Sequence, residues 1–428
     1  LRMEDAWGHV LSHISQRDLL AVERVSKSMK KVARREWSLQ KEVDMQRDFP
    51  KATTDSEYMI ALIDRLSPSL SSLRIGAPSA ALDGQRSHHD DFPSRHTITR
   101  SVIEEISKRC LRLRKLAIHR MVLTLNALIA FPMLPCTIEE LTITICRMDV
   151  YTEEEGRLAQ EAMTKLVSSL PQLRRFEILG RGACYDHFVL DERVLHQLSP
   201  SVTHINLSAG SSLKLADLRF IKQRQLDSFT LQRSFISSVD LEGLVNISPN
   251  IRHLDLAYSR NISDYSAISS LQFLKTLNLS GNRYLRDEHL DTICRGCPAM
   301  IEVDLDHCDQ LTSGGLVSLG LLHSLQRLSL SGLPSVNLVV IEALTRCIDL
   351  ARLDVSFCRN VDVTCLSSLL SDFPLLRLVV LKGNSVDGKL VSILRGESIL
   401  PFLECDLFEP CIPVPPPIPV RPPLLPLL

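Results

Sequence analysis

A short apolar motif recurs through the second half of this 428-residue chain and constrains its fold more than any other feature. The motif reads apolar-x-x-apolar-x-apolar, and its copies start 25, 23, 26, 25, 25, 26 and 26 residues apart. A period held over eight copies indicates stacked structural repeats rather than one globular core. The copies are Leu226-Phe229-Leu231, Ile251-Leu254-Leu256, Leu274-Leu277-Leu279, Met300-Val303-Leu305, Leu325-Leu328-Leu330, Leu350-Leu353-Val355, Leu376-Val379-Leu381 and Phe402-Cys405-Leu407.

Five weaker copies precede these at irregular spacing: Leu70-Leu73-Ile75, Leu113-Leu116-Ile118, Ile138-Leu141-Ile143, Leu173-Phe176-Ile178 and Val202-Ile205-Leu207. This period and pattern are those of leucine-rich repeats, which run about 20–29 residues. Each repeat should form one short strand and a helical return, and stacked repeats should form an α/β solenoid, a horseshoe with a parallel sheet on its inner face. We expect about 12–13 repeats over residues 70–408, with surface insertions near 83–96 and 147–160.

Several repeats resemble the cysteine-containing subtype of leucine-rich repeats. Asp306-His307-Cys308 and Ser356-Phe357-Cys358 follow their strands in the order that this subtype shows. The resemblance implies that the thiol packs under the turn after the strand, as a small buried core residue. Other copies depart from the subtype, with Ser259, Asn282 and Asn384 in place of cysteine.

Residues 3–45 differ from the repeats and predict three short amphipathic helices. The order of their residues resembles an F-box, through the segments Val10–Ser15, Asp18–Leu20, Val25–Met29 and Trp37. The usual Leu-Pro is not present, and Met29 stands where the family has tryptophan. A plain helical cap is the alternative interpretation, because a solenoid needs its ends covered. Residues 46–69 should then be a linker helix.

The F-box resemblance implies a substrate-recognition subunit of an SCF-type cullin-RING ubiquitin ligase. Its partners would be a Skp-type adaptor, a cullin and a target protein. By this analogy the adaptor would be bound by Val10, Leu11, Ile14, Leu19, Leu20 and Val25. Such a subunit promotes the reaction by proximity and needs no catalytic residue of its own. The alternative is a repeat scaffold without a ligase link, such as a cytoskeletal or signalling adaptor.

The concave face should carry columns of polar side chains, because alternate strand residues point out of the core. We expect a target protein to be bound there by Asp255, Asn278, Asp304, Asp354, Arg327 and Arg352. Charge-assisted hydrogen bonds would hold the target, and Tyr258 and Phe357, just past their strands, are candidate anchors. Alternatively, these side chains only pair with one another in solvent, each pair contributing about 0–1 kcal/mol.

No motif in the chain indicates enzyme chemistry. There is no phosphate-binding glycine loop, HExxH or GxSxG, and the 49 basic and 50 acidic residues balance, which does not favour nucleic acid or an anionic membrane. Cys294 and Cys297 form a CxxC without a second pair at matching spacing, and His88–Asp91 is best explained as a charged loop. We therefore expect no catalytic residue, cofactor, metal, nucleic acid or membrane partner.

The last part of the chain, 409–428, is rich in proline and should be an extended polyproline-II arm. Pro416–Arg421 fits PxxPxR, the pattern that SH3 domains bind, although an unstructured tail explains the same composition. Glu4 and Asp5 interrupt any apolar signal-peptide run, and the cysteines suit a reducing compartment. We expect a cytoplasmic and/or nuclear protein.

Overall fold

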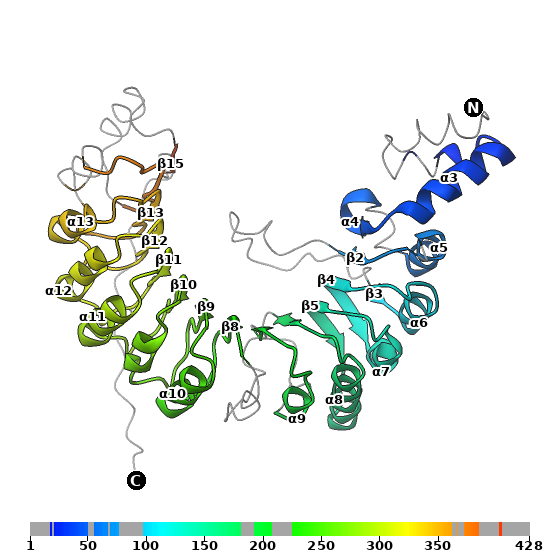
Figure 1. Cartoon of the computed structure of the whole chain (residues 1–428), viewed down its shortest axis with the longest axis horizontal. Helices are drawn as coiled ribbons and strands as arrows, with labels where there is room; N and C mark the ends of the chain where they lie inside the picture. Colours follow the sequence, from blue (N-terminus) through cyan, green and yellow to red (C-terminus); the bar gives the residue numbers. More distant parts are fainter. Residues whose placement is uncertain are drawn as a thin grey trace, which may run out of the picture.

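The computed structural model describes residues 18, 21–49, 55–66, 69–76, 97–180, 192–207, 225–361, 365, 372–384 and 402–404. Over these residues the chain forms a horseshoe, with strands along its inner side and helices along its outer side (Figure 1). The expected leucine-rich-repeat solenoid is confirmed. None of the described helices has the length and apolar run that crossing a bilayer requires.

One 15-stranded parallel sheet lines the inner side. Its strands follow the chain order because each helical return places the next strand beside the last. β3 (Thr97–Ile98) lies off this path and pairs with β4. The strands along the path are β1 (Glu42–Asp44), β2 (Ser72–Ile75), β4 (Lys115–Thr124), β5 (Glu140–Asp149), β6 (Arg175–Gly180), β7 (His204–Asn206), β8 (Ser228–Thr230), β9 (His253–Asp255), β10 (Thr276–Asn278), β11 (Glu302–Asp304), β12 (Arg327–Ser329), β13 (Arg352–Asp354), β14 (Leu378–Val380) and β15 (Phe402–Glu404).

The returns on the outer side are α-helices, in places continued or replaced by 3-10 turns. Consecutive returns pack on one another, as α5 does on α6 and α11 on η6. The described returns and N-terminal helices are α3 (Lys27–Leu39), α4 (Met45–Asp48), α5 (Ser56–Leu66), α6 (Arg100–Arg109), α7 (Leu125–Ala130), η3 (Phe131–Met133), α8 (Glu153–Ser168), α9 (Glu192–His196), α10 (Ser238–Ile247), η6 (Ser266–Ser270), α11 (Asp287–Gly296), α12 (Ser313–Leu316), η7 (Val317–Leu321) and α13 (Leu338–Leu344).

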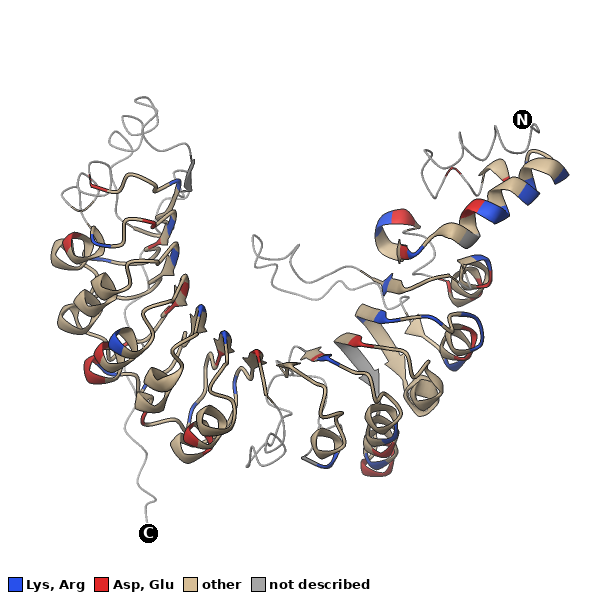
Figure 2. Cartoon of the chain, in the orientation of Figure 1, with Lys and Arg blue, Asp and Glu red and all other residues tan. Residues whose placement is uncertain are grey.

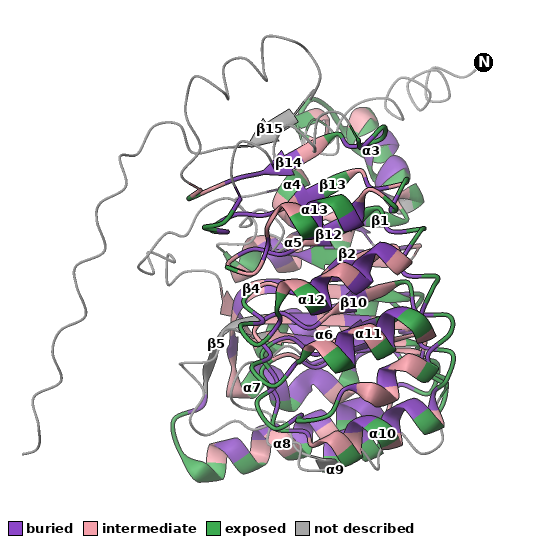
Figure 3. Ribbon diagram, turned by 90° about the vertical axis from the view of Figure 1, so that its left-hand side faces the viewer, coloured by how far each residue is buried: buried purple, intermediate pink, exposed green. Residues whose placement is uncertain are grey.

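The apolar motif builds the core layer by layer. In β10, Leu277 is buried, whereas Thr276 and Asn278 are partly exposed, because successive strand side chains point to opposite faces. Leu274 before the strand and Leu279 after it are also buried. Each repeat thus adds one layer to a continuous core between sheet and helices (Figure 3). A single layer would expose its apolar faces to water, so the repeats stabilise one another only when stacked.

In the turns after the strands, either a cysteine or an asparagine donates a hydrogen bond to a buried carbonyl oxygen of the preceding repeat. The Cys308 thiol donates to the Leu279 carbonyl oxygen of the preceding repeat at 3.1 Å, as the subtype resemblance implies. In the repeat before it, the Asn282 amide nitrogen donates to the Leu256 carbonyl oxygen at 3.0 Å. A buried carbonyl needs a donor, and either side chain supplies one. Asparagine therefore replaces cysteine without a change of fold.

The sheet starts earlier than the repeat pattern indicated. β1 lies inside the range 3–45 that we assigned to the helical module, and 46–69 holds most of α4 and all of α5 rather than one linker helix. The motif missed this strand because Gln40 occupies the first apolar position, although Val43 and Met45 are buried at the other two. β1 pairs with β2 in parallel, so the repeat array includes the end of the N-terminal module.

The last repeat and the expected insertions also differ in detail. β15 pairs Leu403 with Val379, two residues before Cys405, which the motif aligned there. The segment 147–160 contains the end of β5 and the start of α8, whose Thr152–Glu155 capping box fixes the helix start. The expected insertion at 83–96 and the proline-rich arm 409–428 lie outside the described residues.

Candidate protein-binding surface

The sheet brings the predicted target-binding residues together on the concave face of the arm formed by β9–β13. The strand register joins Asp255, Asn278, Asp304, Ser329 and Asp354 in one row, called here the acid row. Arg327 and Arg352 are register partners in the neighbouring row. Charged segments line the inner side of this arm in Figure 2. The grouping follows from the register, while target binding by these residues stays a prediction.

The acid row also has a structural role, because its members end their strands. The Asp255 carboxylate accepts a hydrogen bond from the Ala257 backbone N–H at 3.0 Å. This bond satisfies a donor that the strand leaves open as the chain turns. Equivalent bonds run from Ser280 N–H to Asn278, from Asp306 N–H to Asp304 and from Ser356 N–H to Asp354.

Ser329 occupies the acid row without a carboxylate or amide that could accept the turn N–H, and Asp306 accepts that hydrogen bond in its place. Its hydroxyl is too short to replace the carboxylate, so Asp306 of the preceding repeat accepts from the Ser331 N–H at 2.7 Å and from the Ser329 hydroxyl at 2.6 Å. Asp306 thereby joins the acid row in function, although its place in the sequence lies two residues beyond β11. The motif alone did not identify it.

The carboxylates of this surface have no cationic partner within the described part of the chain. Among the described residues, no ion pair involves Asp255, Asp304, Asp306 or Asp354. Burial raises the pKa of Asp255 and of Asp306. Burial, with the nearby Asp306, Asp255 and Asp354 carboxylates, raises the pKa of Asp304 to about 7. Negative charge is therefore concentrated here in a poorly solvated place, and a cation from outside would relieve it.

We expect Asp304→Asn to stabilise the fold at about pH 8 and to have little effect at about pH 4. The folded-state pKa of Asp304, about 7, lies above its ordinary value of 3.8. Its contribution to stability is therefore fully present below the ordinary pKa and is lost as the pH rises to about 7. An amide avoids this loss and still accepts the turn N–H, as Asn278 does. Urea unfolding of variant and parent at both pH values measures the difference in their free energies of unfolding. Equal destabilisation of the variant at both pH values would contradict the prediction.

The row beside the acid row, which includes Arg327 and Arg352, has part of its positive charge neutralised by acidic residues of the sheet. Arg327 lies 3.4 Å from Glu302, and Lys115 lies 3.0 Å from Glu140. Such exposed pairs contribute about 0–1 kcal/mol each, and Arg327 forms one of them, while its part in target binding stays a prediction. Arg352, by contrast, takes part in no ion pair among the described residues. Of the two predicted arginines, Arg352 is the one whose charge is open to a partner.

A third row of residues lies past the strand ends, three positions after the last residue of each strand, and is called here the rim row. Every member has a positive φ, between 55° and 76°. From Tyr258 onward, large side chains alternate with glycines in it. Sequence reasoning named Tyr258 and Phe357 but missed their partners; the alternation becomes visible only once the strand register is known. The rim row is Arg233, Tyr258, Gly281, His307, Gly332, Phe357 and Gly383.

The predicted adaptor-binding residues are only partly placed. Outside the described residues lie Val10, Leu11, Ile14, Leu19 and Leu20. Val25 is 71% exposed, directly before α3, whose N-cap Ser26 accepts a hydrogen bond from the Met29 N–H at 3.1 Å. Val22 packs partly against the core. A single exposed apolar side chain is ordinary on a protein surface, so adaptor binding by these residues stays a prediction.

The CxxC pair belongs to the core of the repeats. Cys294 and Cys297 are both buried, and the Cys297 thiol donates to the Ile268 carbonyl oxygen at 3.2 Å. Burial raises the pKa of each thiol to about 12, so both stay protonated at neutral pH. Within the part of the chain that the structure describes, no group of three or more metal-ligating side chains comes together.

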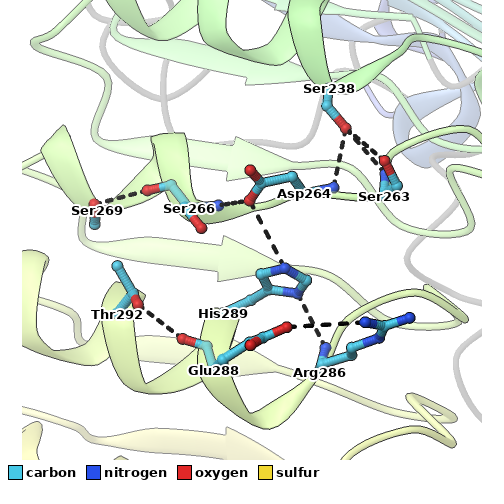
Figure 4. Close-up of polar contacts among 9 residues, drawn as sticks. All are labelled: Ser238, Ser263, Asp264, Ser266, Ser269, Arg286, Glu288, His289 and Thr292. Carbon is cyan, nitrogen blue, oxygen red and sulfur yellow. Dashed lines mark hydrogen bonds and ion pairs between the residues drawn. The ribbon is translucent and has the colours of Figure 1, made fainter.

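Polar contacts also join successive repeats at the turns where the returns begin (Figure 4). The Ser238 hydroxyl accepts from the Ser263 and Asp264 N–H groups at 3.0 and 2.9 Å. Asp264 lies 3.7 Å from the His289 Nε2, and the His289 Nδ1 accepts from the Arg286 N–H at 3.2 Å. These side chains are used in holding the repeats together, so this edge is structural, and the candidate binding surface is the concave face with its rim row.

No protein-family model matches the chain. Part of it is 31% identical over 145 residues to "Antagonist of mitotic exit network protein 1" of Candida glabrata, and part is 27% identical over 126 residues to "F-box/LRR-repeat protein 4" of Bos taurus. These matches cover 30% and 28% of this chain, and 28% and 20% of the relatives, so the chain spans under a third of either relative.

A solved structure shares the architecture over nearly the whole chain. A chain of the crystal structure of the yeast Rad7 and Elc1 complex gives a TM-score of 0.58 at 17% identity, covering 90% of both chains. At this identity the likeness shows the fold, a leucine-rich-repeat horseshoe. One curated relative is named for an F-box and leucine-rich repeats, and this match supports the F-box/LRR type that the sequence resemblance implied.

Proposed function

We propose that this chain, a leucine-rich-repeat protein of the F-box/LRR type, is the substrate-recognition subunit of an SCF-type cullin-RING ubiquitin ligase. The observation that carries the proposal is that an exposed apolar residue of the N-terminal module and the polar concave face lie far apart on one solenoid. Val25 is exposed at the N-terminal end, and the acid and rim rows lie on the opposite arm (Figure 1). A molecule built in this way joins two partners at a set distance.

The proposed mechanism is positioning, with no catalytic residue in this chain. The N-terminal module binds a Skp-type adaptor and through it a cullin, while the concave face holds the target near the loaded ubiquitin-transferring enzyme. Holding two reactants together replaces an encounter in solution by an intramolecular step and raises the rate through effective concentration. The proposed place of action is the cytoplasm and/or the nucleus.

The likeness to known proteins supports this proposal at the level of type. One curated relative carries both F-box and LRR-repeat in its name, and the structure of similar fold is one of a complex between two proteins, Rad7 and Elc1. A horseshoe that leaves Val25, just before α3, exposed suits a subunit that works within an assembly.

The test is a pull-down with matched surface variants. We expect the full chain to recover a Skp-type adaptor and a cullin from cell lysate, and the double variant Leu11→Glu/Val25→Glu to lose both, because charges cannot be buried in an apolar contact without a large cost. Val239→Glu is the control: Val239 is 76% exposed, on α10, where the repeats face outward. If neither the parent nor the control recovers the adaptor and cullin, the ligase role is wrong.

One observation favours the alternative of a scaffold without a ligase link. Trp37, the residue that the F-box resemblance places last, is fully buried, with its ring centroid 5.6 Å from that of Phe49. Trp37 thus covers the first repeat, as a solenoid cap does. Under this alternative the concave face still binds a protein, and the pull-down recovers that protein without adaptor or cullin.

A further inference from the structure

The rim row presents aromatic side chains to solvent in a fixed arrangement. Tyr258 is 41% exposed and Phe357 is 51% exposed, and His307 between them is exposed as well. Positive φ is uncommon for bulky residues, and glycine, which adopts it freely, occupies three other positions of the same row. A row that only had to turn the chain would favour glycine throughout, so the aromatic positions point to contact with a ligand.

The three ring-bearing side chains of the row each lean over the glycine of the next repeat. A Cβ added at Gly281 would overlap the ring of Tyr258, and one at Gly383 would overlap the ring of Phe357. His307 covers Gly332 in the same manner. The rings are therefore held in place by the backbone beneath them, which reduces the conformational entropy that binding would remove.

The row already binds a cation within the chain. The guanidinium of Arg233, the first member, lies over the Tyr258 ring at 5.4 Å from its centroid. An aromatic face attracts such a cation through its quadrupole. Nearby Asp306 and Asp304 carboxylates add negative charge, and with burial as the main cause they help raise the pKa of Tyr258. Near the Tyr258 ring, Arg233 supplies one positive charge against the two carboxylates of Asp304 and Asp306. Among the described residues these carboxylates have no ion pair, so the charge balance around the ring suits a further cationic group.

The spacing of the aromatic positions limits the shape of the ligand. Tyr258, His307 and Phe357 belong to every second repeat, and neighbouring strands lie about 4.8 Å apart, so the rings recur about every 10 Å. Three residues of an extended polyproline-II chain span about 9 Å. A segment lying along the rim thus brings every third side chain to a ring.

We propose that the rim row, with the acid row beside it, binds an extended segment of the target protein that carries arginine or lysine at about every third residue. The exposed rings of His307 and Phe357 receive cationic groups of the segment, and at Tyr258 such a group takes the place that Arg233 holds. The carboxylates of Asp304, Asp306 and Asp354 neutralise these groups. This deepens the proposed function, since it assigns a chemistry to the target that the concave face recognises, and it applies equally to a scaffold without a ligase link.

The direct test is fluorescence anisotropy of the full chain with a labelled peptide of about five Arg-Pro-Pro units, a pre-extended probe. We expect Tyr258→Gly/Phe357→Gly to weaken binding about tenfold, because the rings supply most of the contact. Glycine fits the positive φ at both positions, so the fold is retained. The control is Phe273→Ala: Phe273 is 57% exposed but lies before β10, at the opposite end of the strands, and its loss should leave binding within about twofold.

A second pair of variants tests the charges. Asp304→Asn/Asp354→Asn keeps the turn hydrogen bonds, as Asn278 shows, and is expected to weaken peptide binding about tenfold. Glu342→Gln on the outward-facing α13 removes charge elsewhere and should have no such effect. Binding of the parent should also tighten from about pH 6 to about pH 8 as Asp304 ionises beside Asp255, Asp306 and Asp354.

The outcomes separate this inference from the ligase proposal. Absence of peptide binding, equal binding of a Glu-Pro-Pro peptide of the same length, or unchanged binding by both double variants would each overturn the cationic-segment inference, whatever the pull-down recovers. If the unaltered chain binds the peptide but recovers no adaptor or cullin in the pull-down, the ligase role alone is overturned.

Discussion

Trp37→Ala is expected to lower the free energy of unfolding of the first repeats by about 3–5 kcal/mol, the usual loss for truncating a buried tryptophan. Trp37 is fully buried at the end of α3, against Phe49, and closes the core next to β1. Because each repeat contacts only its neighbours, the loss should be local. Amide hydrogen exchange should therefore accelerate in β1 and β2 and remain unchanged in β11–β13.

Two matched variants sharpen this prediction. Leu39→Ala, two residues further on, removes a side chain that is 61% exposed and should cost less than about 1 kcal/mol. Trp37→Phe keeps most of the apolar packing and removes an indole N–H that has no acceptor among the described residues, so its cost should stay below about 1.5 kcal/mol. Unchanged exchange in β1 and β2 of the alanine variant would show that Trp37 is no cap.

Gly296→Ala and Gly243→Ala make the same change at two helical positions and are expected to shift stability in opposite directions. A Cβ at Gly296, the last residue of α11, would overlap the backbone carbonyl oxygen of Ser269 in η6. Backbone cannot rotate away as a side chain can, so we expect a loss of about 1–3 kcal/mol. A Cβ at Gly243 in α10 meets nothing within 4 Å, and alanine there should stabilise by about 0.4–1 kcal/mol.

Urea unfolding of the two variants beside the parent measures both effects. The comparison is informative because helix propensity favours alanine at both sites, which leaves the contact with η6 as the difference between them. Stabilisation by Gly296→Ala would mean that α11 and η6 do not approach as closely as the structure shows, and the packing of these two returns would need revision.

The repeat motif predicted correctly which strand residues are buried in the core. Leu254, Leu277, Val303, Leu328 and Leu353, the central apolar positions of five motifs, are each buried in the middle of a strand. A strict period fixes these positions because a side chain at any other phase would face solvent. The same logic placed the acid row in one line. It failed where the pattern was broken, at β1, where a glutamine takes an apolar position, and at β15, where the strand lies two residues early.

The candidate site was predicted less completely than the fold. Asp304 and Asp354 were identified from the motif, but Asp306 was not, because its role arises from a serine in the next repeat. Tyr258 and Phe357 were noticed as separate aromatics, whereas the row they form with Arg233 depends on contacts between residues about 25 positions apart.

The sequence by itself determined the architecture of this protein, because periodic burial of apolar side chains admits one stacking of strand and return and leaves one face of each strand to solvent. It also determined which side chains occupy that face. Only the tertiary structure decided which carboxylates have no cation beside them among the described residues, which rings are held over a glycine, and that Trp37 lies within the core. These properties depend on distances between neighbouring repeats, and no local pattern in the chain encodes such distances.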